Sequence, residues 1–189
     1  LESIKNLDEK NNLIKSLEEK PDKEWLRRIY ECEDEKALKY FLKDATDFQI
    51  LENSYDLKIL WECCQIPDFV KKTYGNHLEI ISKVFKFLTS KNKRIPNQYM
   101  KEQLASLDKI EGNVDSISNR IANVRTWSYV ANKANWVENQ DYWVERAKNL
   151  EDKLSDRLHE ELTKTFIDKR ASVLACLLYT SPSPRDKRQ

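Results

Sequence analysis

The chain has 189 residues, of which 33 are Lys or Arg, 32 are Asp or Glu and only 2 are Gly, with a formal net charge of +1 at pH 7. This balance lacks the overall basic excess typical of nucleic-acid-binding domains, so any such site must be a local patch. Two isolated glycines cannot form a P-loop, whose glycine amides cradle phosphate. No apolar run is long enough to predict a membrane span.

The scarcity of glycine and the absence of alternating apolar patterns between turn signals indicate an all-α fold. We predict an irregular multi-helix bundle of about seven to eight helices, followed by a disordered C-terminal tail. About 175 residues are sufficient for one domain or for two small helical subdomains.

Apolar residues recur at helical spacing along the first part of the chain. The pattern predicts helices over about residues 1–19, 22–29, 35–44 and 54–66. Pro21 and Pro67 interrupt it, while Asp22, Asp34 and Ser54 stand where N-caps are expected. We expect residues 1–70 to form one helical segment.

Residues 71–175 are predicted to form a C-terminal helical domain. Helices are expected over about residues 75–91 and 96–107, with Pro96 in the first turn of the second. Gly112 ends that region and Asp115 is the expected cap of the next helix. One face of this next helix carries Ile117, Ile121, Val124, Ser128 and Ala131.

A long helix is expected over about residues 140–168, roughly 43 Å at about 1.5 Å per residue. Asn139 is its expected N-cap, and Lys169 and Arg170 suit the negative end of the helix dipole. The face that we expect to be buried carries Trp143, Ala147, Leu150, Leu154, Leu158, Leu162 and Phe166.

The last residues have a different character. Residues 176–186 read CLLYTSPSPRD, which resembles the in-frame translation of a transposase-type sequencing-library adapter. We interpret residues 176–189 as a non-native tail, the alternative being a short natural disordered tail. Because the chain also starts at Leu1 without methionine, we expect a fragment of a longer protein.

No pattern in the sequence indicates catalysis. His159 begins a zincin-like HEEL, but the second histidine of that motif would fall at Thr163. Cys63 and Cys64 have no histidine at a suggestive spacing and no CxxC partner, so they are interpreted as reduced, buried thiols of a cytoplasmic protein. We expect no catalytic residue, metal or cofactor in this chain.

A cluster of cations and aromatic rings points to a binding function instead. Single-stranded nucleic acid is commonly held by such interleaving, because phosphates meet Arg or Lys and bases lie on aromatic faces. The alternative is that the tryptophans pack between helices while the arginines bridge carboxylates. The candidate residues are Arg120, Arg125, Trp127, Tyr129, Lys133 and Trp136, with a second basic cluster at Lys164, Lys169 and Arg170.

A family resemblance favours the first interpretation. The runs RIANVRTWSYVANKANW and YWVERAKNLEDKLSDRLHEELTKTFIDKRASVL resemble the C-terminal region of bacterial relatives of the mitochondrial degradosome RNA helicase. Further likeness lies in WLRRIYECEDEKALKYFLKD, LWECCQIPDF and GNHLEIISKVFKFL. The resemblance covers about residues 1–175, and the ATPase motifs of the family would lie upstream of Leu1.

The resemblance implies an accessory helical region beside the RecA-like motor domains of an ATP-dependent helicase. The parent enzyme would use ATP and Mg, and this region would guide or clamp RNA or another single strand. Two alternatives remain open: a docking module for a protein such as an exonuclease, and a structural brace on the motor core.

Overall fold

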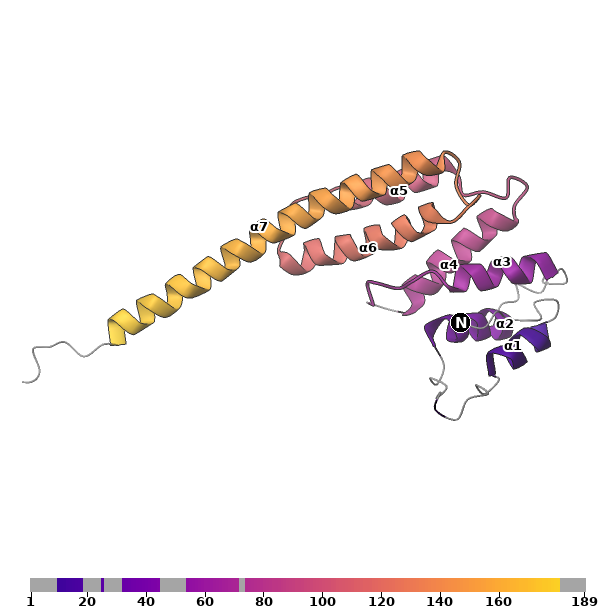
Figure 1. Ribbon diagram of the computed structural model, residues 1–189, viewed down its shortest axis with the longest axis horizontal. Coiled ribbons are helices and arrows are strands. Elements are labelled where there is room, and N and C mark those ends of the chain that lie inside the picture. The colour runs from indigo at the N-terminus through magenta and orange to yellow at the C-terminus, as the bar shows by residue number, and fades with distance from the viewer. Residues whose placement is uncertain (1–9, 19–24, 26–31, 45–53, 72–73, 181–189) are drawn as a thin grey trace, which may run out of the picture.

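The computed structural model describes residues 10–18, 25, 32–44, 54–71 and 74–180 (Figure 1). Every named element in these ranges is a helix, which confirms the predicted all-α class. The helices are α1 (Lys10–Glu18), α2 (Glu33–Asp44), α3 (Ser54–Cys64), α4 (Tyr74–Thr89), α5 (Asn97–Leu107), α6 (Val114–Asn132) and α7 (Gln140–Thr180). Apart from Trp25, the helix expected over residues 22–29 lies outside the described residues, as do residues 181–189 of the expected tail. Residues 176–180, which were expected to belong to that tail, form the end of α7 instead.

The N-terminal half is a small stack of helices, in which α2 packs on α3 and α3 packs on α4. Its core is made by one side of each helix, as the apolar spacing predicts. α4 packs on α3 across the expected domain boundary at residue 70, and the buried residues on the two sides of that boundary belong to a single cluster. The buried side chains of this half include Leu13, Leu38, Phe41, Leu57, Leu60, Ile66, Leu78, Ile81 and Val84.

The C-terminal half is built on α6 and α7, which make the most extensive contact in the molecule and run in opposite directions (Figure 1). α5 packs against α6. Ile117, Ile121, Val124 and Ala131 of α6 are buried as predicted, and Trp143, Ala147, Leu150 and Leu154 of α7 are buried with them.

Several helix boundaries differ from the prediction. Pro96 is the N-cap of α5 and not part of its first turn, and Asp34 lies in the first turn of α2 and not at its cap. The cap of α6 is Asn113, whose side chain accepts a hydrogen bond from the amide of Ser116 at 2.9 Å, whereas Asp115 lies in the first turn. α7 does not end near Asp168 but continues to Thr180. Its 41 residues give it a length of about 61 Å. Figure 1 shows its far end extending well beyond α6.

The loop before α5 is tied to the loop before α7. The amide of Ile95 donates to the carbonyl of Trp136 at 2.8 Å, within an isolated bridge between Ile95 and Val137. Asn97 then donates its side-chain amide to Glu138 at 3.0 Å and accepts from the indole N–H of Trp143 at 2.8 Å. These bonds fix the start of α7 against the start of α5.

Candidate nucleic-acid interface

The tryptophans of the predicted cluster lie in the core. Trp127 is 2% exposed, and Trp136 and Trp143 are buried as well. Trp127 contacts the ring of Tyr99 edge to face, with centroids 5.7 Å apart. A ring enclosed in this way offers no face to a base, so the structure removes Trp127 from the candidate stacking residues.

The two arginines of the predicted cluster both have partners within the fold. Arg120 donates from Nη1 to the carbonyls of Lys109 at 2.7 Å and Glu111 at 2.5 Å, which closes the loop between α5 and α6. Arg125 donates from Nε to Oε1 of Glu151 on α7 at 2.8 Å. The expected alternative of an arginine bridging a carboxylate therefore describes Arg125, while Arg120 binds backbone oxygens.

Lys133 lies beside two aromatic rings of the predicted cluster. Its Nζ lies 5.2 Å from the ring centroid of Tyr129 and 5.8 Å from that of Trp136. A cation at this distance from ring faces is attracted by the ring quadrupole. Tyr129 and Lys133 are both half-buried, at the end of α6 that meets the loop to α7.

Beside this cluster lies a groove of about 720 Å³, bounded by α3, the α4–α5 loop and the α6–α7 loop. Lys93 and Asn135 both adopt left-handed backbone conformations in these loops, with φ of 49° and 66°. Lys93 places its Nζ 4.9 Å from the ring centroid of Tyr55. The groove residues are Tyr55, Lys58, Ile59, Glu62, Leu88, Asn92, Lys93, Arg94, Ala134, Asn135, Trp136 and Glu138.

The charges along this groove are mixed but favour cations. Lys58, Lys93 and Arg94 face Glu62 and Glu138, and Glu138 already accepts a hydrogen bond from Asn97. Among the described residues, none hydrogen-bonds to the guanidinium of Arg94. The groove thus combines an available planar cation with the exposed ring of Tyr55, while Trp136 beside it is buried.

Sequence reasoning did not identify Tyr55, Lys93 or Arg94. They come from two segments far from α6 in the chain, and only the fold brings them beside Trp136. One local signal existed: the run KNKR at residues 91–94 places three cations within four residues, in the loop before α5.

The second predicted basic cluster lies elsewhere. Lys169 and Arg170 are exposed near the far end of α7, where the guanidinium carbon of Arg170 lies 5.6 Å from the ring centroid of Phe166. About 30 residues of helix separate them from the groove, or roughly 45 Å. The structure therefore does not bring Lys169 and Arg170 together with Tyr129 and Lys133.

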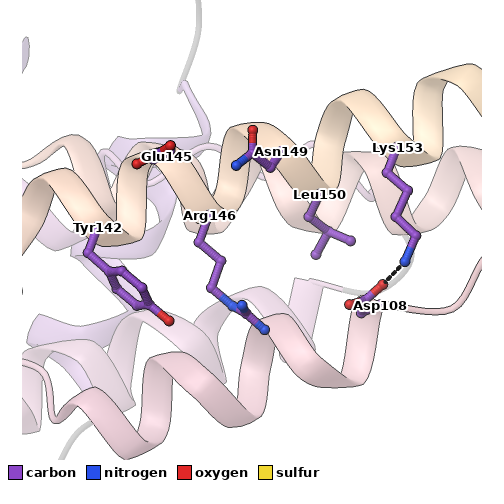
Figure 2. Close-up of a pocket in the computed structure, with 7 residues that line it drawn as sticks. All are labelled: Asp108, Tyr142, Glu145, Arg146, Asn149, Leu150 and Lys153. Carbon is purple, nitrogen blue, oxygen red and sulfur yellow. Dashed lines mark hydrogen bonds and ion pairs between the residues drawn. The ribbon is translucent and has the colours of Figure 1, made fainter.

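A smaller cavity of about 370 Å³ lies between α7 and the end of α5. Figure 2 shows Tyr142, Arg146 and Leu150 projecting from α7 towards α5. Lys153, further along α7, forms an ion pair with Asp108 at 2.6 Å.

The buried cysteines are chemically inert in this fold. Burial is the main cause that raises the pKa of the Cys63 thiol and of the Cys64 thiol well above the ordinary value, and neighbouring negative groups add to it. A protonated thiol is a poor nucleophile and a poor metal ligand. Within the described ranges, no group of three or more His, Cys, Asp or Glu side chains is arranged to hold a metal ion.

No family model, curated protein or solved structure matches the chain. The resemblance to degradosome helicases therefore stays a prediction from the sequence. In the part of the chain that the structure describes, none of the helices combines the length and apolar character needed to cross a membrane.

Proposed function

We propose that this chain is a helical accessory domain that binds single-stranded nucleic acid, as a region beside the RecA-like motor of an ATP-dependent RNA helicase would. The observation that carries the proposal is the groove between α3, the α4–α5 loop and the α6–α7 loop. Its cations lie beside the exposed ring of Tyr55, and cations beside an aromatic ring hold backbone phosphates and bases without reading their sequence.

Two properties of the groove support binding to a strand over binding to a small anion. Its volume of about 720 Å³ exceeds what one phosphate needs. Its cations are also spread along a helix and a loop, with Lys58 on α3 and both Lys93 and Arg94 in the α4–α5 loop. Since the whole chain carries a net charge of only +1, this local arrangement has to supply the attraction.

The proposal is tested with fluorescence anisotropy of a labelled oligouridylate against the full chain over a range of salt concentrations. Arg94→Ala should weaken binding about tenfold, the loss of one charge-assisted contact of about 1.4 kcal/mol. It should also make the log–log salt dependence shallower by about 0.7, as expected when one phosphate contact to a single strand is lost.

Lys101→Ala is the matched control, because Lys101 is an exposed cation on α5 that lines neither hollow. It should leave both the affinity and the salt dependence unchanged. Absence of any salt-sensitive binding by the unaltered chain would refute the proposed function. An equal loss in both variants would show that net charge matters and the groove does not.

A second function, docking to a protein, is favoured by one observation. Beyond Leu158, α7 exposes a series of large apolar side chains that includes Leu162, Phe166, Ile167, Val173 and Leu174. If a protein covers this segment, Phe166→Ser with Ile167→Ser should abolish nuclease-resistant association with it and leave oligouridylate binding intact. Loss of oligouridylate binding in this variant would instead tie the segment to the nucleic acid.

A further inference from the structure

We propose that the cavity between α5 and α7 is a second subsite for the same single strand, in which Arg146 binds a phosphate and Tyr142 stacks on a base. This inference rests on the proposed function, because it extends the path of a strand already held in the groove. Three observations support it: the Arg146 guanidinium has no partner among the described residues, the Tyr142 ring is exposed, and the cavity follows the groove along the chain.

Arg146 is available for a ligand. Among the described residues, none forms a hydrogen bond or an ion pair with its guanidinium, and Figure 2 shows this group directed from α7 towards α5. The other arginines of the described ranges, apart from Arg94, have partners within the fold. Those partners are the loop carbonyls for Arg120, Glu151 for Arg125, Glu160 and Glu161 for Arg157, and the Phe166 ring for Arg170.

Arg94 and Arg146, the arginines of the described ranges without such a partner, line the groove and the α5–α7 cavity respectively. Guanidinium groups bind phosphate through a planar fork of N–H donors, so a free one in a hollow is suited to an anionic ligand. This coincidence is the strongest reason to treat the two hollows as parts of one binding path.

Tyr142 supplies the stacking surface. It lies one helical turn before Arg146 on the same side of α7, and its side chain is 55% exposed. Its ring contacts that of Trp143 edge to face, with centroids 4.9 Å apart and an interplanar angle of 77°. Trp143 is itself buried and anchored to Asn97, so the phenol ring is supported by a fixed neighbour.

The local charges favour an anion at Arg146. Asp108, the carboxylate on the α5 side, is already paired with Lys153 at 2.6 Å. Glu145 also borders the cavity, but Figure 2 shows it on the opposite edge of α7 from the Arg146 guanidinium. The unpaired charge that faces the interior of the cavity is therefore the positive charge of Arg146.

The two hollows are neighbours along the chain. Glu138 lines the groove, and Tyr142, four residues later, lines the cavity. Asn97 lies between them, donating to Glu138 and accepting from Trp143. A strand that leaves the groove at Glu138 therefore meets Tyr142 next, and a longer oligonucleotide is needed to reach Arg146.

Oligonucleotide length provides the test, with anisotropy measured for the full chain and a series of labelled oligouridylates. For long oligonucleotides, Arg146→Ala should weaken binding about tenfold and lower the salt slope by about 0.7. Tyr142→Ala should weaken it at least about fivefold through the lost stacking, whereas Tyr142→Phe should bind normally. For oligonucleotides that fill only the groove, the Arg146 and Tyr142 variants should match the unaltered chain.

Lys148→Ala is the matched control, since Lys148 is an exposed cation two residues along α7, on the opposite side of the helix. Circular dichroism checks that each variant folds. Loss of binding in Arg94→Ala with none in Arg146→Ala or Tyr142→Ala at any length would overturn the second subsite and leave the proposed function standing. The second subsite would also be overturned if polyglutamate displaced the long oligonucleotide as effectively as unlabelled oligouridylate does. The cavity would then bind any polyanion, with no contribution from base stacking.

Discussion

The two ends of α7 have the same helical periodicity but opposite surroundings. In its first segment, residues 140–158, the apolar face packs against α6, and Leu154 is 0% exposed. In its distal segment, residues 162–180, the same kind of face is open, with Leu162 48% and Phe166 61% exposed. Apolar spacing thus predicts which face of a helix seeks a partner, but it does not show whether the chain contains that partner.

The length of α6 explains where the change occurs. α6 has 19 residues and runs antiparallel to α7, so at about 1.5 Å per residue it can cover roughly the first 19 residues of its partner. Counted from Gln140, that coverage ends near Leu158, which is half-buried. Beyond this point Figure 1 shows no helix beside α7.

The largest difference between the two segments is expected from trimming one leucine in each. Leu154→Ala should lower the free energy of unfolding by about 2–5 kcal/mol, since it removes buried apolar contacts and leaves a cavity. Leu162→Ala makes the same chemical change at an exposed position and should stay within about 0.5 kcal/mol. Urea denaturation followed by circular dichroism measures both. Similar losses would mean that the distal segment is covered in solution, for example by a second copy.

The cysteines should show an effect of intermediate size when the packed helices are compared with the distal segment of α7. Cys63 and Cys64 lie in the packed body, whereas Cys176 lies exposed on the distal segment. Since burial raises the pKa of Cys63 and Cys64, the unfolded chain loses these protons at a lower pH than the folded chain does. The free energy of unfolding should therefore fall as pH rises above the ordinary thiol pKa of about 8.5, by up to about 1.4 kcal/mol per pH unit for each thiol.

Urea titrations at about pH 8 and about pH 10 measure the first part of this change, which continues up to the raised pKa of the folded thiols. Cys63→Ala with Cys64→Ala should flatten the pH dependence, and Cys176→Ala should not alter it. In the folded chain iodoacetamide should modify the exposed Cys32 and Cys176 before the buried Cys63 and Cys64. Rapid modification of Cys64 without unfolding would contradict the burial on which this prediction depends.

The smallest effect is expected from the ion pair that joins α6 to the first segment of α7. Arg125→Gln removes the bond to Glu151, but the arginine side chain is 54% exposed, so the cost should be at most about 1 kcal/mol. The cost should shrink further at high salt, because solvent screens exposed charges. A salt-independent loss of several kcal/mol would contradict this prediction, because it would mean that the ion pair contributes more to stability than an exposed pair can.

Local patterns predicted the helices well, because each helix in the described ranges buries one periodic face. They also indicated that Lys133 and Tyr129 lie beside Trp136. The end of α7 was missed because Lys169 and Arg170 look like a dipole-matched terminus, while residues 171–180 contain no proline or glycine to stop the helix. The boundary near Asn113 was missed because two plausible caps lie two residues apart.

The candidate interface was less predictable for a different reason. A burial pattern identifies Trp143 as a core residue, but nothing local separates Trp127 from a surface ring. Tyr55, Arg94 and Arg146 become neighbours of a hollow only through packing between distant segments. Which cations stay unpaired is also a tertiary property, since Arg120 and Arg125 differ from Arg146 only in what the fold places near them.

The hydrogen bond from Trp143 to Asn97 gives the molecule a built-in optical reporter. Indole emission shifts to longer wavelength and weakens as water gains access. The Trp143 indole is buried against Tyr142, which lines the cavity, and Trp136 lines the groove. Occupancy by a strand should quench or shift that emission without any attached dye. Replacing Trp25, which is 75% exposed, would remove a source of background signal.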